Sequence, residues 1–100
     1  MHVDDVAEAC TFLLRTYSGE GHLNIGTGSD ISIAELASEI ARVTGFKGRI
    51  AWDTSKPDGT MLKRMDVSRI AALGWQARIG FREGLEATYR WFLDQPALRT

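Results

Sequence analysis

The sequence predicts an α/β or α+β fold in which about four helices cover a small sheet of short strands. Two observations carry this prediction. Apolar residues recur at steps of three and four in several segments, which is the periodicity of helices with one buried face. Short stretches between them alternate apolar and polar residues, which is typical of strands. Interleaved helices and strands form one layered domain, so we expect residues 1–100 to be a single domain.

The first helix is predicted to begin after Asp4 or Asp5, since either side chain can accept from its free N–H groups. The apolar residues that follow at helical spacing are Val6, Ala9, Cys10, Leu13 and Tyr17. Cys10 is the only cysteine, and its neighbours favour a small buried side chain over a nucleophile. Residues 22–25 then predict a short strand, and residues 26–30 a turn.

The second helix has the clearest local signals in the chain. Ser32 and Glu35 form a capping box, in which each side chain satisfies the backbone N–H of the other residue. Gly45 stands where a helix commonly ends in the left-handed conformation. The stripe that we expect this helix to bury consists of Ile33, Leu36, Ala37, Ile40 and Val43.

Residues 48–53 predict a second strand, with Ile50 and Trp52 on one face. A core position is the favoured interpretation of Trp52, and stacking on a nucleotide base is the alternative. Asp66 is predicted to cap a short helix over residues 67–73.

Gly74 is predicted to end that short helix. A last helix is expected from about Phe81, with Leu85, Tyr89 and Phe92 on one side, ending before Pro96. Gly84 inside it is a weak point, because Gly costs about 1 kcal/mol relative to Ala in a helix.

Charge is divided unevenly along the chain. The formal net charge is -1, yet residues 1–41 carry seven acids and one arginine, and residues 42–69 carry seven cations and three acids. The acidic first part argues against a nucleic-acid surface, which needs a broad basic face. The clustered cations favour a local site for one phosphorylated ligand, and a solvated surface is the alternative interpretation.

Membrane and metal sites are not expected. No stretch approaches the roughly 20 apolar residues of a membrane span, and the first residues are acidic where a signal peptide needs cations. A cytoplasmic protein is therefore expected. His2 and His22 have no Cys partner at ligand spacing. Gly26-Thr27-Gly28 precedes a helix, but Ile31 stands where a dinucleotide fingerprint continues to Gly.

Three stretches together carry a family resemblance. They are His-Val-Asp-Asp at 2–5, Asp53-Thr54-Ser55-Lys56-Pro57-Asp58-Gly59-Thr60 with Lys63 and Asp66, and Ser68-Arg69-Ile70-Ala71-Ala72-Leu73-Gly74-Trp75. With them the chain resembles, over essentially its whole length, the C-terminal part of the GDP-L-fucose synthases, which are extended short-chain dehydrogenases/reductases. The complete Rossmann domain of that fold is not expected in this chain.

The chain departs from the family pattern at one point. In these synthases Pro-Asp-Gly-Thr is usually followed by Pro-Arg-Lys. Here Met61 and Leu62 replace the first two residues, and Lys63 keeps the third. The departure removes a cation and a rigid turn residue. Arg64 either compensates or faces water.

The resemblance implies an NADPH-dependent enzyme that converts GDP-4-keto-6-deoxy-D-mannose to GDP-L-fucose by epimerising two ring carbons and reducing a ketone. Its catalytic residues and its NADPH belong to the N-terminal domain, so no catalytic or cofactor-binding residue is expected here. The family's Tyr with a Lys four positions later is missing, because Gly21 follows Tyr17 and Leu93 follows Tyr89 at that distance. Two alternatives stay open: another NAD(P)-dependent sugar-nucleotide epimerase or dehydratase, and a free-standing, non-catalytic interaction module.

On this resemblance, Lys63 and Asp58 are expected to contact the GDP-sugar substrate, with Lys56 behind them. A lysine meets a diphosphate as a point charge. Asp58 either accepts from a sugar hydroxyl or guanine, or only holds the turn. The isolated chain is expected to be inactive and to bind a GDP-sugar weakly at best. We also expect it to self-associate through apolar surface that a missing Rossmann domain would cover.

Overall fold

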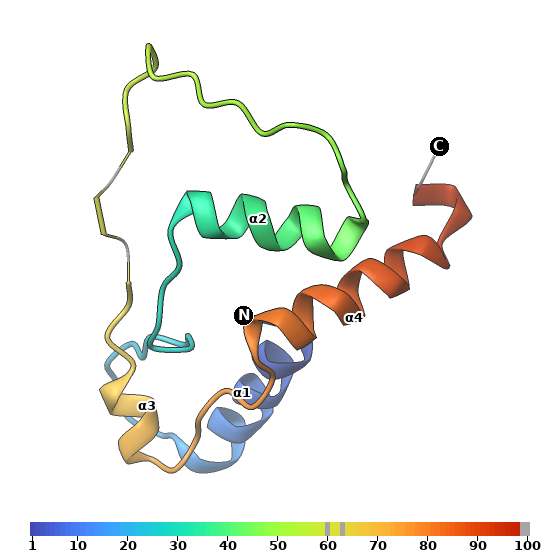
Figure 1. Ribbon diagram of the computed structural model, residues 1–100. Helices are drawn as coiled ribbons and strands as arrows, with labels where there is room; N and C mark the ends of the chain where they lie inside the picture. Colours follow the sequence, from blue (N-terminus) through green and yellow to red (C-terminus); the bar gives the residue numbers. More distant parts are fainter. Residues whose placement is uncertain (60, 63, 99–100) are drawn as a thin grey trace.

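The computed structural model describes residues 1–59, 61–62 and 64–98. It contains four α-helices and a short 3₁₀ helix, namely α1 (Val3–Thr16), α2 (Ile33–Thr44), α3 (Ser68–Ala72), α4 (Phe81–Leu93) and η1 (Pro96–Leu98). Irregular segments join them, and the longest of these arches from the end of α2 to α3 (Figure 1). No helix in the described part is long and apolar enough to cross a membrane.

The predicted sheet is wrong, and with it both the α/β and the α+β fold class, because the described part of the chain contains helices and no β-strand. Residues 22–25 and 48–53 are irregular. Ile50 and Trp52 are 40% and 56% exposed, so the core position of Trp52 is wrong as well. Alternating apolar residues indicate that one face of a segment favours burial, but a strand also needs a neighbouring backbone to bond. Neither segment has such a neighbour among the described residues.

The predicted boundaries of α2 and α4 are confirmed. Ser32 Oγ accepts from the backbone N–H of Glu35 at 3.1 Å, and Gly45 adopts the left-handed conformation with φ 74° just after α2. The last helix begins at Phe81 and ends before Pro96. These signals are local in sequence, so they specify a helix end without help from the rest of the fold.

The start of α1 differs from the prediction. His2 is its N-cap, and His2 Nδ1 accepts from the backbone N–H of Asp4 at 3.1 Å. Capping by Asp4 or Asp5 is therefore wrong, because the helix begins at Val3, before either carboxylate. Cys10 is exposed on α1, which corrects its predicted burial.

A small apolar core joins α1, α3 and the segment after α3. Its buried residues are Ala9, Ile70 and Trp75, and partly buried side chains around them are Phe12, Leu13, Ile25, Val67 and Ala77. The radius of gyration is 16.9 Å, whereas a compact domain of this length has about 13 Å. The chain is therefore more open than a compact domain.

Helix α2 lies against α4 but leaves much of its apolar stripe uncovered. Leu36, Ala37 and Val43 are half-buried, whereas Ile33 is 67% and Ile40 43% exposed. Full burial of this stripe is thus wrong for the chain as it stands. The amphipathic pattern is present, but the chain does not supply enough apolar surface to cover it.

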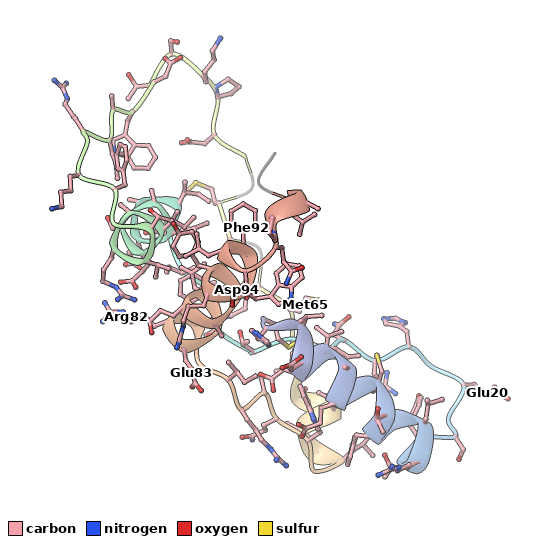
Figure 2. All side chains as sticks on the ribbon, turned by 90° about the vertical axis from the view of Figure 1, so that its right-hand side faces the viewer. Glu20, Met65, Arg82, Glu83, Phe92 and Asp94 are labelled. Carbon is pink, nitrogen blue, oxygen red and sulfur yellow. The ribbon has the colours of Figure 1, made fainter. Side chains whose placement is uncertain are left out.

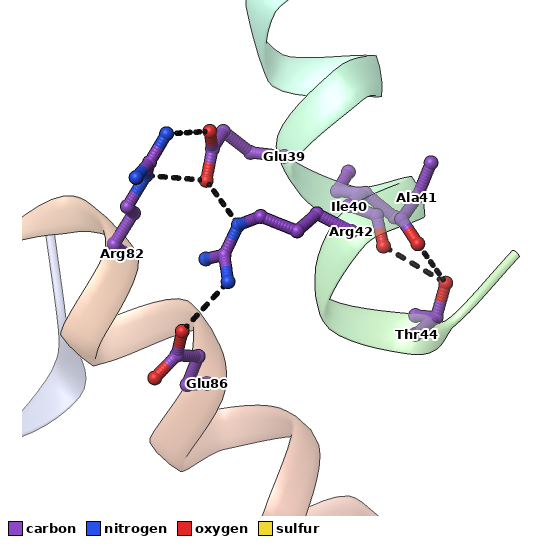
Figure 3. Close-up of polar contacts among 7 residues, drawn as sticks. All are labelled: Glu39, Ile40, Ala41, Arg42, Thr44, Arg82 and Glu86. Carbon is purple, nitrogen blue, oxygen red and sulfur yellow. Dashed lines mark hydrogen bonds and ion pairs between the residues drawn. The ribbon is translucent and has the colours of Figure 1, made fainter.

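Charged side chains connect α2 to α4 (Figure 3). Arg82 on α4 holds Glu39 on α2 with both arms of its guanidinium, at 2.9 Å from Nε to Oε2 and 2.6 Å from Nη2 to Oε1. Arg42 donates to Glu39 Oε2 at 3.1 Å and pairs with Glu86 Oε1 at 3.0 Å. Chiefly Arg82, and then Arg42, lowers the pKa of Glu39. Two-armed guanidinium pairs fix geometry as well as charge.

We predict that Glu39→Gln weakens the contact between α2 and α4 at neutral pH. A carboxyl group whose pKa is lowered in the folded state stabilises that state above its ordinary pKa, which is 4.5 for Glu39, and loses this effect as the pH falls through the lowered value. The variant should therefore have a lower unfolding free energy at pH 7 and a flatter pH dependence on the acid side of 4.5. Urea unfolding at a series of pH values measures both. Glu20→Gln is the control, since Glu20 is an exposed acid far from α4 (Figure 2); equal acid slopes in Glu39→Gln and the parent chain would contradict the prediction.

Candidate functional site

The segment from Trp52 to Asp66 carries the residues that sequence reasoning assigned to ligand binding. Its described residues are all exposed. The described part of its ribbon runs apart from the helices until it reaches α3 (Figure 1), and side chains project from its first part in Figure 2. Such a segment presents its charges to whatever approaches it, but it does not by itself form the wall of a cavity.

A local turn opens the segment. Asp53 Oδ1 accepts from the hydroxyl of Ser55 at 2.5 Å and from its backbone N–H at 3.0 Å. The backbone N–H of Lys56 donates to the Asp53 carbonyl at 3.4 Å. The Ser55 hydroxyl first, and its N–H second, lower the pKa of Asp53. This arrangement, in which an aspartate bonds its own backbone two residues on, orders the chain directly before Lys56.

A second aspartate closes the segment. Asp66 Oδ1 accepts from the backbone N–H of Ser68 at 2.9 Å, and this bond lowers the pKa of Asp66. The predicted capping by Asp66 is wrong, because the short helix begins at Ser68 with Val67 as its N-cap and has no side-chain cap bond. Asp66 instead orders the turn directly before the helix. Asn24 Nδ2 donates to the Asp66 carbonyl at 3.3 Å. The end of the segment is therefore fixed to the body of the chain.

The three predicted substrate residues have different outcomes. Lys56 and Asp58 are exposed on the segment and line neither of the hollows found among the described residues. Lys63 lies outside the described residues. Arg64 is exposed. The contacts expected of Lys63, Asp58 and Lys56 with a substrate thus stay predictions.

Sequence reasoning missed a hollow of about 670 Å³ on another part of the molecule. Its walls come from the first two residues, the turn before α2, Glu35 of α2, residues 77–81 and the first turns of α4 around Gly84. A Cβ at Gly84 would stand 3.3 Å from His2 Cβ and 3.3 Å from Ile79 Cγ2. Gly84 is therefore a point of close approach between α4 and the start of α1, and not only a weak point of the helix. A glycine inside an apolar helical pattern was the available signal.

The described residues that resemble parts of a catalytic site have structural roles. The Tyr17 hydroxyl donates to the Gly21 carbonyl at 2.6 Å, and the Tyr89 ring stacks on Phe92 with centroids 6.5 Å apart. Gly28 has φ 78°, as a turn requires. The structure shows no group of three or more His, Cys, Asp or Glu fit for a metal ion in the described part.

Comparisons with known proteins identify the relatives of this chain. It is 52% identical over 93 residues to GDP-L-fucose synthase 1 of Arabidopsis thaliana, covering 93% of this chain and 29% of that protein. It is 46% identical to the GDP-L-fucose synthase of Escherichia coli K12, covering 94% of this chain and 32% of that protein. The chain is a relative of the GDP-L-fucose synthases. No protein-family model matches it.

Solved structures agree with this relationship to the GDP-L-fucose synthases. A GDP-6-OMe-4-keto-L-xylo-heptose reductase from C. jejuni matches with a TM-score of 0.85 at 35% identity, over 95% of this chain and 30% of that one. A GDP-mannoheptose C4 reductase from Campylobacter jejuni, solved with NADP bound, matches with a TM-score of 0.81 at 34% identity, over 93% of this chain and 30% of that one. The chain thus spans about 30% of the length of its relatives. The resemblance to the C-terminal part of GDP-L-fucose synthase is confirmed.

We predict that Ser55→Ala raises the pKa of Asp53 toward its ordinary value of 3.8, because the Ser55 hydroxyl is the main cause of its lowering. The remaining backbone N–H bond should keep the pKa somewhat below that value. An NMR titration of the aspartate side chains measures the change. Asp66 is the internal control, since its pKa depends on Ser68. An unmoved Asp53 pKa, or an equal shift at Asp66, would contradict the assignment.

Proposed function

We propose that this chain is the C-terminal, sugar-nucleotide-binding part of an NADPH-dependent GDP-L-fucose synthase. The parent enzyme acts on GDP-4-keto-6-deoxy-D-mannose in the cytoplasm, and residues 1–100 form one domain of it. The observation that carries the proposal is the identity of 46% to 52% with GDP-L-fucose synthases over more than nine-tenths of the chain. Identity at this level, spread across the whole chain, supports a shared function of the part.

The chain's own residues do not fit NADPH. The Gly26-Thr27-Gly28 turn lacks the third glycine of a dinucleotide fingerprint, since Ile31 occupies that position. Tyr17 and Tyr89 lack the lysine that would lower a phenol pKa. The cofactor and the catalytic groups are therefore assigned to the rest of the proposed enzyme, and no chemical step is assigned to this chain. Its contribution is to bind and orient the sugar nucleotide.

The segment from Asp53 to Asp66 is the proposed substrate contact. Lys63 meets the diphosphate, Asp58 accepts from a sugar hydroxyl or guanine, and Lys56 supports them. Two features of the structure favour this assignment: the Asp53–Ser55 turn orders the backbone before Lys56, and the charged side chains among the segment's described residues are exposed. A ligand held only from this side binds weakly, because a single exposed wall does not pre-organise it.

A second candidate is a related GDP-sugar reductase with a different sugar. The likeness to the C. jejuni GDP-heptose reductase, at a TM-score of 0.85, favours this alternative. Both candidates require a GDP diphosphate contact and differ in the sugar. Comparing GDP-4-keto-6-deoxy-D-mannose with GDP-keto-heptoses and with UDP-sugars as substrates separates them.

We predict that a chimera in which this chain replaces the corresponding part of the E. coli enzyme oxidises NADPH with GDP-4-keto-6-deoxy-D-mannose. Lys63→Ala in that chimera should raise KM about tenfold or more, because losing a hydrogen bond to a charged group costs about 1.5 to 3 kcal/mol. Its melting temperature should stay unchanged, since a lysine that contacts only the ligand adds nothing to the free fold.

The control for this chimera is Lys47→Ala, which removes an exposed lysine outside the segment. Lys56→Ala and Asp58→Asn should have smaller effects on KM than Lys63→Ala. A folded but inactive chimera would refute the proposed function. An active chimera whose KM ignores Lys63→Ala would remove that residue from the site while leaving the function standing.

The exposed apolar surface of the chain is suited to contact with a Rossmann domain and with a second copy of the chain. The stripe of α2 around Ile33 and Ile40 is open, and we propose that a Rossmann domain covers such surface in the parent enzyme and that free chains associate through it.

Sedimentation velocity over a concentration series tests this association. The unsubstituted 100-residue chain should form dimers or larger species. The double substitution Ile33→Ser and Ile40→Ser should shift the distribution toward monomer. Ala34→Ser is the matched control, because Ala34 is an exposed residue of the same helix. A parent chain that stays monomeric throughout would contradict the prediction.

A further inference from the structure

Asp5 is the charged side chain that the described part of the structure buries, with 1% of its surface exposed. One carboxyl oxygen, Oδ2, accepts from two successive backbone N–H groups, of Arg78 at 3.1 Å and of Ile79 at 2.9 Å. These partners lie 73 and 74 residues further along the chain. A buried carboxyl group with two backbone donors is a long-range constraint on the fold.

Helix capping does not explain this arrangement. His2 already caps α1, and Asp5 points its oxygen at another segment. Because residues 76–79 are irregular, their N–H groups have no helix or strand ladder to enter, and Asp5 satisfies two of them. Backbone donors that are even partly shielded from water, as these two are, need such partners.

A second acid on the same face of α1 holds the same segment. Glu8 lies one turn after Asp5, and its Oε1 is 3.4 Å from Arg78 Nη2. This pair is partly exposed on both sides, so it contributes little to stability. Asp5 is buried, so its bonds contribute more than the Glu8–Arg78 pair to holding this segment against α1.

The two bonds of Asp5 lie directly before α4 and beside the hollow. Arg78 and Ile79 precede Gly80, the N-cap of α4. The adjoining turn of α4 meets His2 at Gly84. Residues 77–81 also form one wall of the 670 Å³ hollow, and His2 belongs to another.

We infer that Asp5 is a positioning residue that fixes the start of α4 against the first turn of α1 and thereby sets the shape of the hollow. This inference goes beyond the proposed function, because it does not depend on which ligand or domain meets that surface. Losing the carboxyl oxygen leaves two N–H groups without partners and frees α4, with α2 attached to it, to move relative to α1 and α3. Asn keeps one acceptor oxygen in the same place, whereas Ala keeps none.

The first measurement is amide hydrogen exchange in the 100-residue chain labelled with ¹⁵N. The amides of Arg78 and Ile79 should be protected in the unsubstituted chain and exchange about tenfold faster or more in Asp5→Ala, as expected for losing an acceptor at a partly buried donor. Asp5→Asn should retain most of the protection. Glu8→Gln is the matched control, since it removes the exposed acid that faces the same residue, and it should change the exchange by less than about threefold.

The second measurement reports where α4 lies. Cys10 is the only cysteine and is exposed on α1, so a spin label there broadens the amide signals of nearby helices. In Asp5→Ala the broadening within α4 should change while that of α3 stays as in the parent chain, and Asp5→Asn should restore the parent pattern. A merely local loss of helix in α1 would alter α1 signals without this selective change.

Each outcome decides the inference. Arg78 and Ile79 amides that exchange freely in the parent chain would overturn it, as would an unchanged α4 pattern in folded Asp5→Ala. If Asp5→Ala does not fold, Asp5→Asn decides: retained protection at both amides supports the inference, and lost protection in a folded protein overturns it.

Discussion

The chain buries very little apolar surface, and the rest of the structure depends on that constraint. Burying an Ile fully contributes about 1.5 to 3 kcal/mol, and the described part has a buried apolar core of only Ala9, Ile70 and Trp75. Such a core joins α1 to α3 but does not reach α2 or the far end of α4. Polar contacts therefore add links that this core does not make: Asp5 bonds the residues directly before α4 from α1, and the Glu39–Arg82 pair links α4 to α2.

The Asp5 bonds and the α2–α4 ion pairs differ in burial and in chemical type. The Asp5 carboxyl group is buried and its bonds to the backbone are partly buried, so salt screens them less than it screens exposed pairs. The α2–α4 network is partly exposed, so salt and acid weaken it. The chain is open, its α1–α4 contact is partly buried, and its α2–α4 contact is exposed to solvent. This combination fits a part that completes its packing against another domain, as the proposed enzyme would require.

The sequence predicted the helices well because their signals are local. Ser32 and Gly45 mark the ends of α2 through bonds to residues three or four positions away. The prediction of a sheet was wrong for the opposite reason. A strand needs a neighbouring strand to pair with, and the alternating pattern around Trp52 does not identify one. Asp5 was misread as a helix cap because its true partners are 73 and 74 residues distant, a separation that no local pattern encodes. The clustered cations predicted a phosphorylated ligand, and the family resemblance named the individual substrate residues. The identity to the synthases supports the resemblance and does not test those residues.

The departure at Met61 and Leu62 changes what the proposed substrate segment offers to a ligand. The family pattern has a rigid proline and a cation there, and this chain has two apolar side chains that are 96% and 59% exposed. Exposed apolar surface gains free energy when it is covered, at roughly 25 cal/mol per Å², whereas a lost cation weakens attraction for a diphosphate. On the proposed function, ligand binding by this segment relies less on charge and more on burial of apolar surface. Such binding should be less sensitive to ionic strength than binding by a segment that keeps the Pro-Arg pair, because screening acts on charges and not on apolar contacts.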